Sequence, residues 1–240
     1  MYPIVWPVLH QKLTASALTV LIALLALCSA GAHAADYGRY DLNQLVSQNA
    51  RPATGATLNM ALVDQMLSAL QQHAGNYPPK FDSPADMQRA KADAGKLMGM
   101  LGAVFSTGPA PPDMLLRMGV LGAVSHNMEV PGGAAYAQTH FERLLKTDPA
   151  HAAGNFQYGT FLGNTGRAKE ALPHLVKAKD RGVVPALHAI GTSHLMLGDQ
   201  ALALENLQAY QKAVPGDASV GKLIDAVRAG KVDVKRAGAR

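Results

Sequence analysis

The chain has 240 residues, a formal net charge of +5 and a single cysteine, Cys28. This length suits one elongated domain or two small ones. The basic residues are not interleaved with aromatic residues, which make up only 5% of the chain, so a nucleic-acid partner is disfavoured. With one cysteine the chain can form neither an internal disulfide nor a cysteine-based metal site. Packing alone must therefore hold the fold together.

The N-terminal segment, residues 1–34, is typical of a secretory signal peptide. Lys12 precedes an apolar run from Ala15 to Cys28, which is shorter than the ~20 residues that a membrane-spanning helix needs. The small residues that end at Ala34 suit a signal peptidase. We therefore expect cleavage after Ala34 and a periplasmic or secreted protein without a membrane span. Two alternatives stay open: an uncleaved anchor, and lipid attachment at Cys28, although Leu27 precedes it where a lipoprotein signal has Gly, Ala or Ser.

Residues 35–112 are expected to form a helical segment with an irregular start. Apolar residues recur at helical spacing near 58–73 and near 84–105, and no strand pattern of useful length is present. The first stretch stops at Gly75, and the second begins after Ser83, an N-cap residue followed by proline. We expect these two helices to dock as an atypical capping pair on the part of the chain that follows.

Residues 113–230 contain a pattern that repeats every 32 to 34 residues. Each unit has an alanine four residues before a bulky apolar residue, and the later units add a glycine before the alanine. The residues concerned are Ala137 and Phe141, Ala171 and Leu175, Ala203 and Leu207, the glycines Gly159 and Gly191, and the closing prolines Pro149 and Pro215. Small residues let paired helices approach closely, and bulky ones fill the space between successive pairs. In the first unit Ser125 stands where the glycine is expected.

This pattern resembles the tetratricopeptide repeat family. The resemblance implies an all-α fold in which antiparallel helical hairpins stack into a short right-handed superhelix. The expected units are residues 118–151, 152–183 and 184–217, followed by a closing helix at 218–229 and a basic tail at 231–240. The chain departs from the family pattern because no unit has the tryptophan and Val183 replaces the second closing proline. The basic tail is a solvated terminus or, alternatively, contacts acidic lipid or cell-wall polymer.

Motifs that carry chemistry are missing from the sequence. It has no glycine-rich phosphate loop, no Gly-x-Ser-x-Gly elbow and no His-Glu-x-x-His motif. We therefore expect no cofactor, no metal and no catalytic residue. The alternative is an enzyme, or an enzyme subunit, with its site in residues 36–112. That segment offers these acid or base candidates: Asp64, His73, Asp82, Asp86 and Asp93.

In the resembled family the concave face is lined mainly by the first helix of each unit, and it holds an extended peptide or a partner helix. The resemblance places groove positions at Phe156, Thr160, Gly163 and Asn164, at His188, Thr192, Leu195 and Met196, and in the first unit at Gly122, His126 and Glu129. The family's clamp for a C-terminal carboxylate uses Lys, Arg and Asn, which do not match here, so that mode is disfavoured.

Phe156 is the one aromatic residue among these groove positions, so we expect it to be the main anchor for a ligand. The sequence thus predicts a non-catalytic exported scaffold or adaptor. Its partner would be a protein or peptide segment, within an envelope assembly or a secretion system. The oligomeric state is not indicated.

Overall fold

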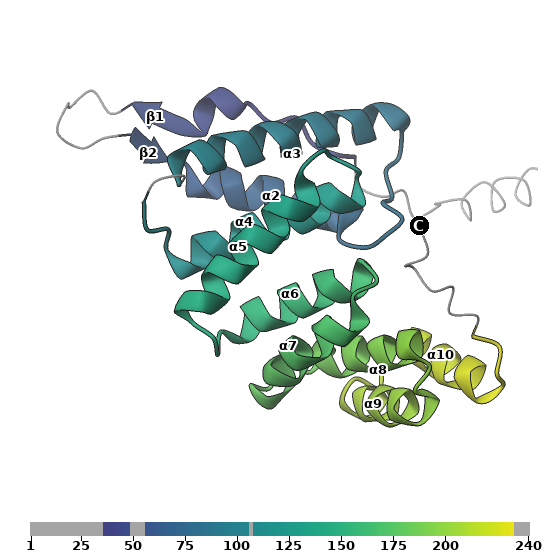
Figure 1. The fold of residues 1–240 in the computed structure, drawn as a ribbon. Helices are drawn as coiled ribbons and strands as arrows, with labels where there is room; N and C mark the ends of the chain where they lie inside the picture. Colours follow the sequence, from purple (N-terminus) through teal and green to yellow (C-terminus); the bar gives the residue numbers. More distant parts are fainter. Residues whose placement is uncertain (1–35, 49–55, 106–107, 233–240) are drawn as a thin grey trace, which may run out of the picture.

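The computed structural model describes residues 36–48, 56–105 and 108–232. This part of the chain is all-α, apart from one short ribbon of two strands (Figure 1). Its helices are α2 (Met60–Ala74), α3 (Pro84–Val104), α4 (Pro112–Asn127), α5 (Gly133–Thr147), α6 (Ala152–Asn164), α7 (Ala168–Asp180), α8 (Pro185–Leu197), α9 (Gln200–Ala213) and α10 (Ala218–Arg228). The expected signal peptide and most of the basic tail lie outside the described residues.

Three antiparallel hairpins follow one another along the second half of the chain, and they consist of α4 and α5, α6 and α7, and α8 and α9 (Figure 1). Adjacent hairpins stack, and α10 packs on α9 at the C-terminal end. The amphipathic α10 buries Val220, Ile224 and Val227 on one face. The expected all-α stack of hairpins is therefore confirmed.

The start of the N-terminal segment is more ordered than expected. A short 3-10 helix, Leu42–Gln44, leads into β1 (Val46–Gln48), which pairs antiparallel with β2 (Ala56–Leu58). Leu45 is completely buried beside this ribbon. Strands of three residues are too short to show an alternating pattern in the sequence, and this explains why an irregular stretch was expected there.

Glycine determines how closely the helices pack within the second and third hairpins. A Cβ atom placed on Gly159 would lie 2.7 Å from Leu175 Cγ, and one on Gly191 would lie 2.7 Å from Leu207 Cγ. Real Cβ atoms do not approach other atoms so closely, so only glycine fits. The register expected for these two units is confirmed.

The register expected for the first unit is wrong. Ser125 is buried, but the close contact falls on Gly122, where a Cβ atom would lie 2.7 Å from Ala137 Cα and 2.8 Å from Gly133 O. The connection between α4 and α5 spans residues 128–132, whereas residues 198–199 suffice between α8 and α9. A longer connection lets α5 settle at a different position along α4, so the spacing of the other units does not carry over.

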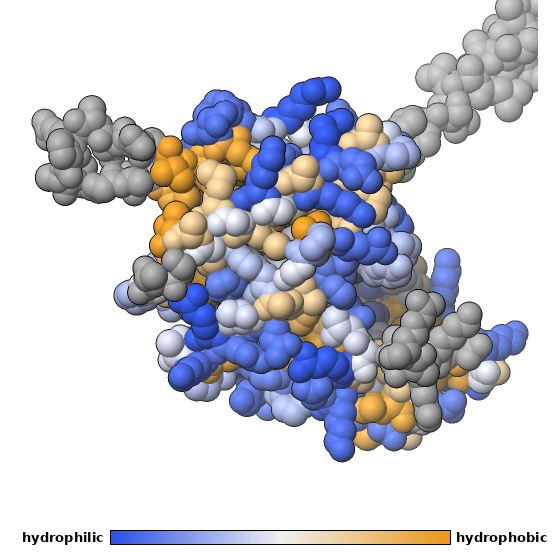
Figure 2. Space-filling view, turned by 45° about the horizontal axis from the view of Figure 1, so that its top comes forward, coloured by the Kyte–Doolittle hydropathy of each residue, from blue (hydrophilic) through white to orange (hydrophobic). Residues whose placement is uncertain are grey.

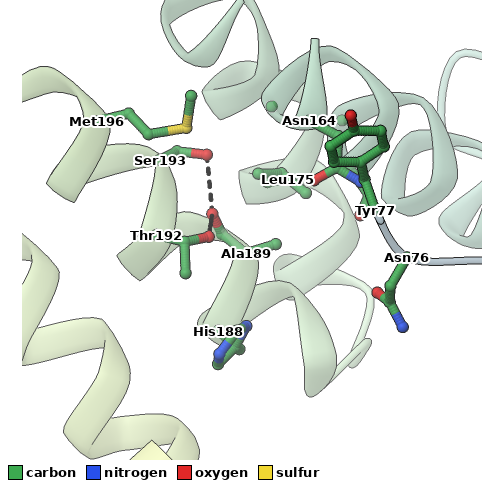
Figure 3. A pocket seen from close by; sticks show the side chains of 12 residues that line it. Asn76, Tyr77, Asn164, Leu175, His188, Ala189, Thr192, Ser193 and Met196 are labelled. Atoms are coloured by element: carbon green, nitrogen blue, oxygen red, sulfur yellow. Dashed lines mark hydrogen bonds between the residues drawn. The ribbon is translucent and has the colours of Figure 1, made fainter. Parts of the chain in front are cut away.

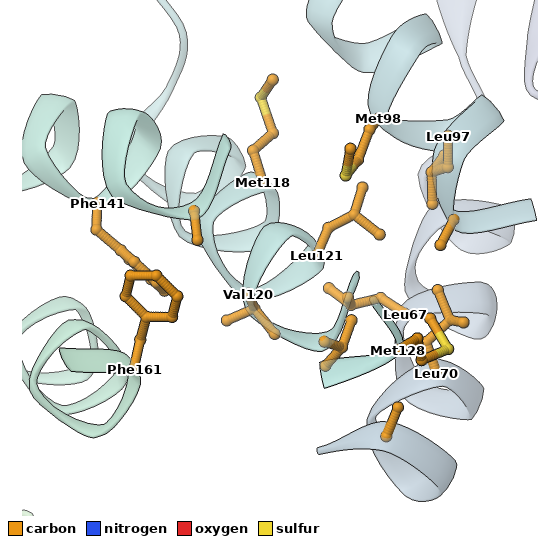
Figure 4. Packing of buried hydrophobic residues seen from close by; sticks show 14 of the residues in the cluster. Leu67, Leu70, Leu97, Met98, Met118, Val120, Leu121, Met128, Phe141 and Phe161 are labelled. Atoms are coloured by element: carbon orange, nitrogen blue, oxygen red, sulfur yellow. The ribbon is translucent and has the colours of Figure 1, made fainter. Parts of the chain in front are cut away.

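The main hydrophobic core runs from the N-terminal helices into the hairpin stack (Figure 4). Met66 and Leu70 of α2, Leu97 of α3 and Leu121 of α4 are all buried in it. The same core continues into α6 and α7 and ends at Ile190 in α8. The helices α2 and α3 therefore cap the stack, as the sequence led us to expect.

A second, smaller cluster holds the C-terminal end. It consists of Leu195, Ala203, Leu207, Val220, Ile224 and Val227. The helix α8 carries residues of both clusters and joins them.

The surface seen in Figure 2 is mainly hydrophilic, and apolar residues gather at the end of the molecule that carries β1 and β2. No helix within the described residues is long and apolar enough to cross a membrane.

Candidate binding groove

A cavity of about 450 Å³ lies between the loop that joins α2 to α3 and the helices α6, α7 and α8 (Figure 3). This volume falls within the ~300–1,000 Å³ of pockets that hold small ligands. We call this cavity the groove. Its lining residues are Asn76, Tyr77, Gly159, Thr160, Gly163, Asn164, Leu175, His188, Ala189, Thr192, Ser193 and Met196.

Two helices supply most of the groove wall. His188, Thr192 and Met196 follow one another at intervals of four along α8, and this spacing puts them on one face of a helix. Thr160 and Asn164 of α6 have the same spacing. In Figure 3 the α8 side chains lie on one side of the cavity, with Asn164 and Tyr77 on the other. The structure thus brings these expected groove residues together around one cavity.

The hydroxyl groups of the groove are not all engaged in the same way. Thr192 Oγ1 and Ser193 Oγ both donate to Ala189 O, over 3.0 and 2.8 Å, so their oxygen atoms remain free to accept. Thr160 Oγ1 is buried and has no partner among the described residues. A buried hydroxyl without a partner costs free energy.

His188 makes the groove wall neutral rather than cationic. Burial lowers the pKa of His188, and the nearby Asp217 carboxylate only partly opposes this effect. The His188 ring meets Tyr210 edge-on, with the ring centroids 5.4 Å apart. Its pKa lies below the usual ~6.5, so the imidazole is uncharged at pH 7. Because no Asp, Glu, Lys or Arg of the described residues lines the groove, these residues give its wall no charge.

Phe156 does not line the groove, although it was the expected anchor. It is half-buried and packs against the main hydrophobic core. Phe156 and His188 hold equivalent positions in successive repeat units, yet only His188 reaches the cavity. Leu195 is likewise buried, in the C-terminal cluster. These two positions are part of the packing.

The first hairpin does not extend the groove either. Gly122 lies inside the contact between α4 and α5. His126 meets Phe161 edge-on at 6.1 Å, and Glu129 sits in a turn with φ of 59°, where its carboxylate is 3.8 Å from Lys91 Nζ. None of the three lines the cavity. Their placement follows from the different register of this hairpin.

The sequence pattern did not reveal Asn76 and Tyr77. Both follow Gly75 in the loop after α2, and the side chain of Tyr77 is 69% exposed even though it borders the groove. The one signal in the sequence is an aromatic residue placed inside a glycine- and proline-containing turn. An aromatic ring there is not needed to end a helix.

Most of the acid and base candidates of the N-terminal segment already have partners within the fold. Asp64 accepts from Arg117 Nε at 2.6 Å, and Asp86 accepts from Ser83 Oγ at 2.8 Å and also pairs with Arg89. Of the remaining candidates, His73 Nδ1 lies 2.9 Å from Lys80 O, Asp93 accepts from Tyr37 at 3.4 Å, and Asp82 is exposed.

None of these candidates lines the groove. Within the described residues, no three His, Cys, Asp or Glu side chains are grouped so that they could hold a metal ion.

Neither a family model nor a curated protein sequence matches this chain. The groove must therefore be interpreted from its own chemistry.

Proposed function

We propose that this protein is a non-catalytic exported scaffold that binds a protein or peptide segment in the groove. The observation that carries the proposal is the convergence of neutral polar side chains from α6, α8 and the loop after α2 on one cavity. A tetratricopeptide-like stack of hairpins supports it, because such stacks offer extended binding surfaces between their units. The periplasm or the extracellular space is the proposed location, which rests on the signal-like residues 1–34.

The chemistry of the groove favours main-chain recognition. Asn76 and Asn164 each offer an N–H donor and a carbonyl acceptor, the two groups that a peptide bond pairs with. Among the described residues that line the groove, no Lys or Arg is present to pair with a terminal carboxylate. An internal segment of a partner protein suits this site better than a chain terminus.

The test is a pull-down from the envelope fraction with residues 35–240 as bait, followed by mass spectrometry. Thr192→Arg places a long charged side chain in the groove and should abolish retention of the partner. Thr147→Arg is the matched control, because Thr147 is exposed at the end of α5 and does not line the groove. Both variants should keep the parent's circular dichroism spectrum. If Thr192→Arg retains the same proteins as the parent, the groove is not the binding site.

A further inference from the structure

The loop after α2 is held firmly at its base. Lys80 N donates to His73 O over 2.7 Å, and Lys80 O lies 2.9 Å from His73 Nδ1. The His73 ring stacks on Phe81, with centroids 4.9 Å apart and planes 12° from parallel, and Tyr37 meets both rings edge-on. These contacts fix both ends of the loop.

A buried hydrogen bond fixes this loop relative to the hairpin stack. Asn127 Nδ2, at the end of α4, donates over 2.9 Å to the carbonyl oxygen of Ala74, the last residue of α2. The loop begins at the next residue, Gly75. The tip is therefore positioned over the groove by the fold as a whole.

The tip carries an aromatic ring that the fold does not use for packing. Tyr77 is 69% exposed, the largest exposed fraction among the large apolar or aromatic side chains of the described residues that stand open to solvent. The ring borders the groove across from α8, whose Met196 offers an apolar side chain (Figure 3). A tyrosine ring supplies contact area and one polar atom at a low cost in conformational entropy, and such residues often dominate binding energy.

We propose that Tyr77 closes the groove over its ligand, and that the ligand is an uncharged, extended peptide segment with one apolar side chain held between Tyr77 and Met196. This inference rests on the proposed function and deepens it. A charged side chain would be desolvated in a wall without a counter-charge, so charged segments are rejected. Asn164 meets the main chain of the segment.

The observations favour a peptide over an oligosaccharide. A pyranose presents hydroxyl groups all around its edge and apolar C–H groups only on its ring faces, whereas the groove offers the flexible apolar side chain of Met196 next to its polar ones. A peptide presents the same alternation, because its polar main chain runs beside separate side chains. The oligosaccharide is kept as an outcome of the test.

The experiment pans a phage library of random decapeptides on residues 35–240 and measures the affinity of the synthesised consensus peptide by fluorescence anisotropy. The selected peptides should be uncharged and share one apolar position. Tyr77→Ala should weaken binding at least ~10-fold, and Tyr77→Phe should stay within about threefold of the parent because the ring remains. Val104→Ala removes apolar surface from an exposed residue at the end of α3 and should leave the affinity unchanged.

Other outcomes overturn the inference in distinguishable ways. If Thr192→Arg abolishes peptide binding and Tyr77→Ala does not, Tyr77 plays no part and the proposed function stands. If the selected peptides are charged, the assigned ligand chemistry is wrong. If no peptide is selected and N-acetylglucosamine oligomers bind instead, with a loss in Tyr77→Ala, the site recognises a saccharide. If neither probe binds, the proposed function fails together with the inference.

Discussion

Three glycine-to-alanine substitutions should change stability in opposite directions, because the same added methyl group meets different surroundings. Gly99, exposed in the middle of α3, has no atom within 4 Å of the position where a Cβ would lie. Gly191 has the Leu207 side chain at 2.7 Å, and Gly122 has backbone atoms of α5 as its neighbours. In all three helices alanine has the higher helix propensity, by ~1 kcal/mol.

The expected free energies follow from these surroundings. Gly99→Ala should stabilise by ~0.5–1 kcal/mol, since nothing opposes the gain in propensity. Gly191→Ala forces Leu207 from its buried position, and overpacking of this kind costs ~1–3 kcal/mol, which leaves a net loss of up to ~2 kcal/mol. In Gly122→Ala the opposing atoms belong to the α5 backbone and cannot rotate away. Its net loss should be ~2 kcal/mol or more.

Urea titration of the three variants, followed by circular dichroism, measures these differences, and thermal unfolding checks them. For a protein of this size ~1 kcal/mol corresponds to ~2–4 °C in Tm. The order of stability should be Gly99→Ala, parent, Gly191→Ala and Gly122→Ala. The reasoning is refuted if Gly122→Ala is as stable as the parent with an unchanged m value, because α4 and α5 then do not touch at this residue.

Three further predictions concern export, acid stability and the N-terminal cap. Protein purified from its native source should begin at Ala35, as N-terminal sequencing would show. Burial, together with Arg143, lowers the pKa of His140 to about 4. The unfolded state therefore takes up this proton first as the pH falls, and stability should decline between pH 6.5 and 4 by up to roughly 3 kcal/mol, a decline that His140→Phe removes. Asn127→Leu leaves the Ala74 carbonyl buried without its donor and should cost ~1–3 kcal/mol in urea titrations.

Each of these has its own check. A native protein that begins at Met1, or that carries lipid on Cys28, contradicts soluble export. The free energies of unfolding of the parent and of His140→Phe should run parallel above pH 7 and diverge below 6. Curves that stay parallel down to pH 4.5 would show that His140 is not buried in its neutral form. Asn206→Leu is the control for Asn127→Leu, because the side chain of Asn206 is only half-buried and bonds to Leu202 O within its own helix.

Much of the fold follows from local patterns. The contact of Gly191 with Leu207 is visible in the sequence because both residues lie in one hairpin, at the same spacing as Gly159 and Leu175. The contact at Gly122 is not visible, since a longer connection changes the register of its hairpin without changing the spacing of the bulky residues. Repeat spacing therefore predicts packing only where the connections have similar lengths.

The groove was predictable only in part, for a related reason. Thr192 and Met196 share a face of one helix, and helical periodicity is enough to group them. Tyr77 reaches the same cavity from the loop after α2, and its position depends on how α2 docks on α4. Such docking is a long-range property that no periodic pattern encodes. Phe156 was misplaced because periodicity gives the face of a helix but not the neighbour that covers it.

The division of the hydrophobic core at α8 has a consequence for affinity. In a stack whose units touch only their neighbours, an end held by a small separate cluster opens at a lower free-energy cost than the middle does. One wall of the groove is formed by α6 and the loop after α2, which belong to the main hydrophobic core's part of the molecule. The other wall is formed by α8, where the two clusters meet. Only molecules with α8 in place have a complete site, so the observed dissociation constant equals the intrinsic one divided by the fraction of such molecules. Substitutions in α10, which does not line the groove, would tune binding through that fraction alone.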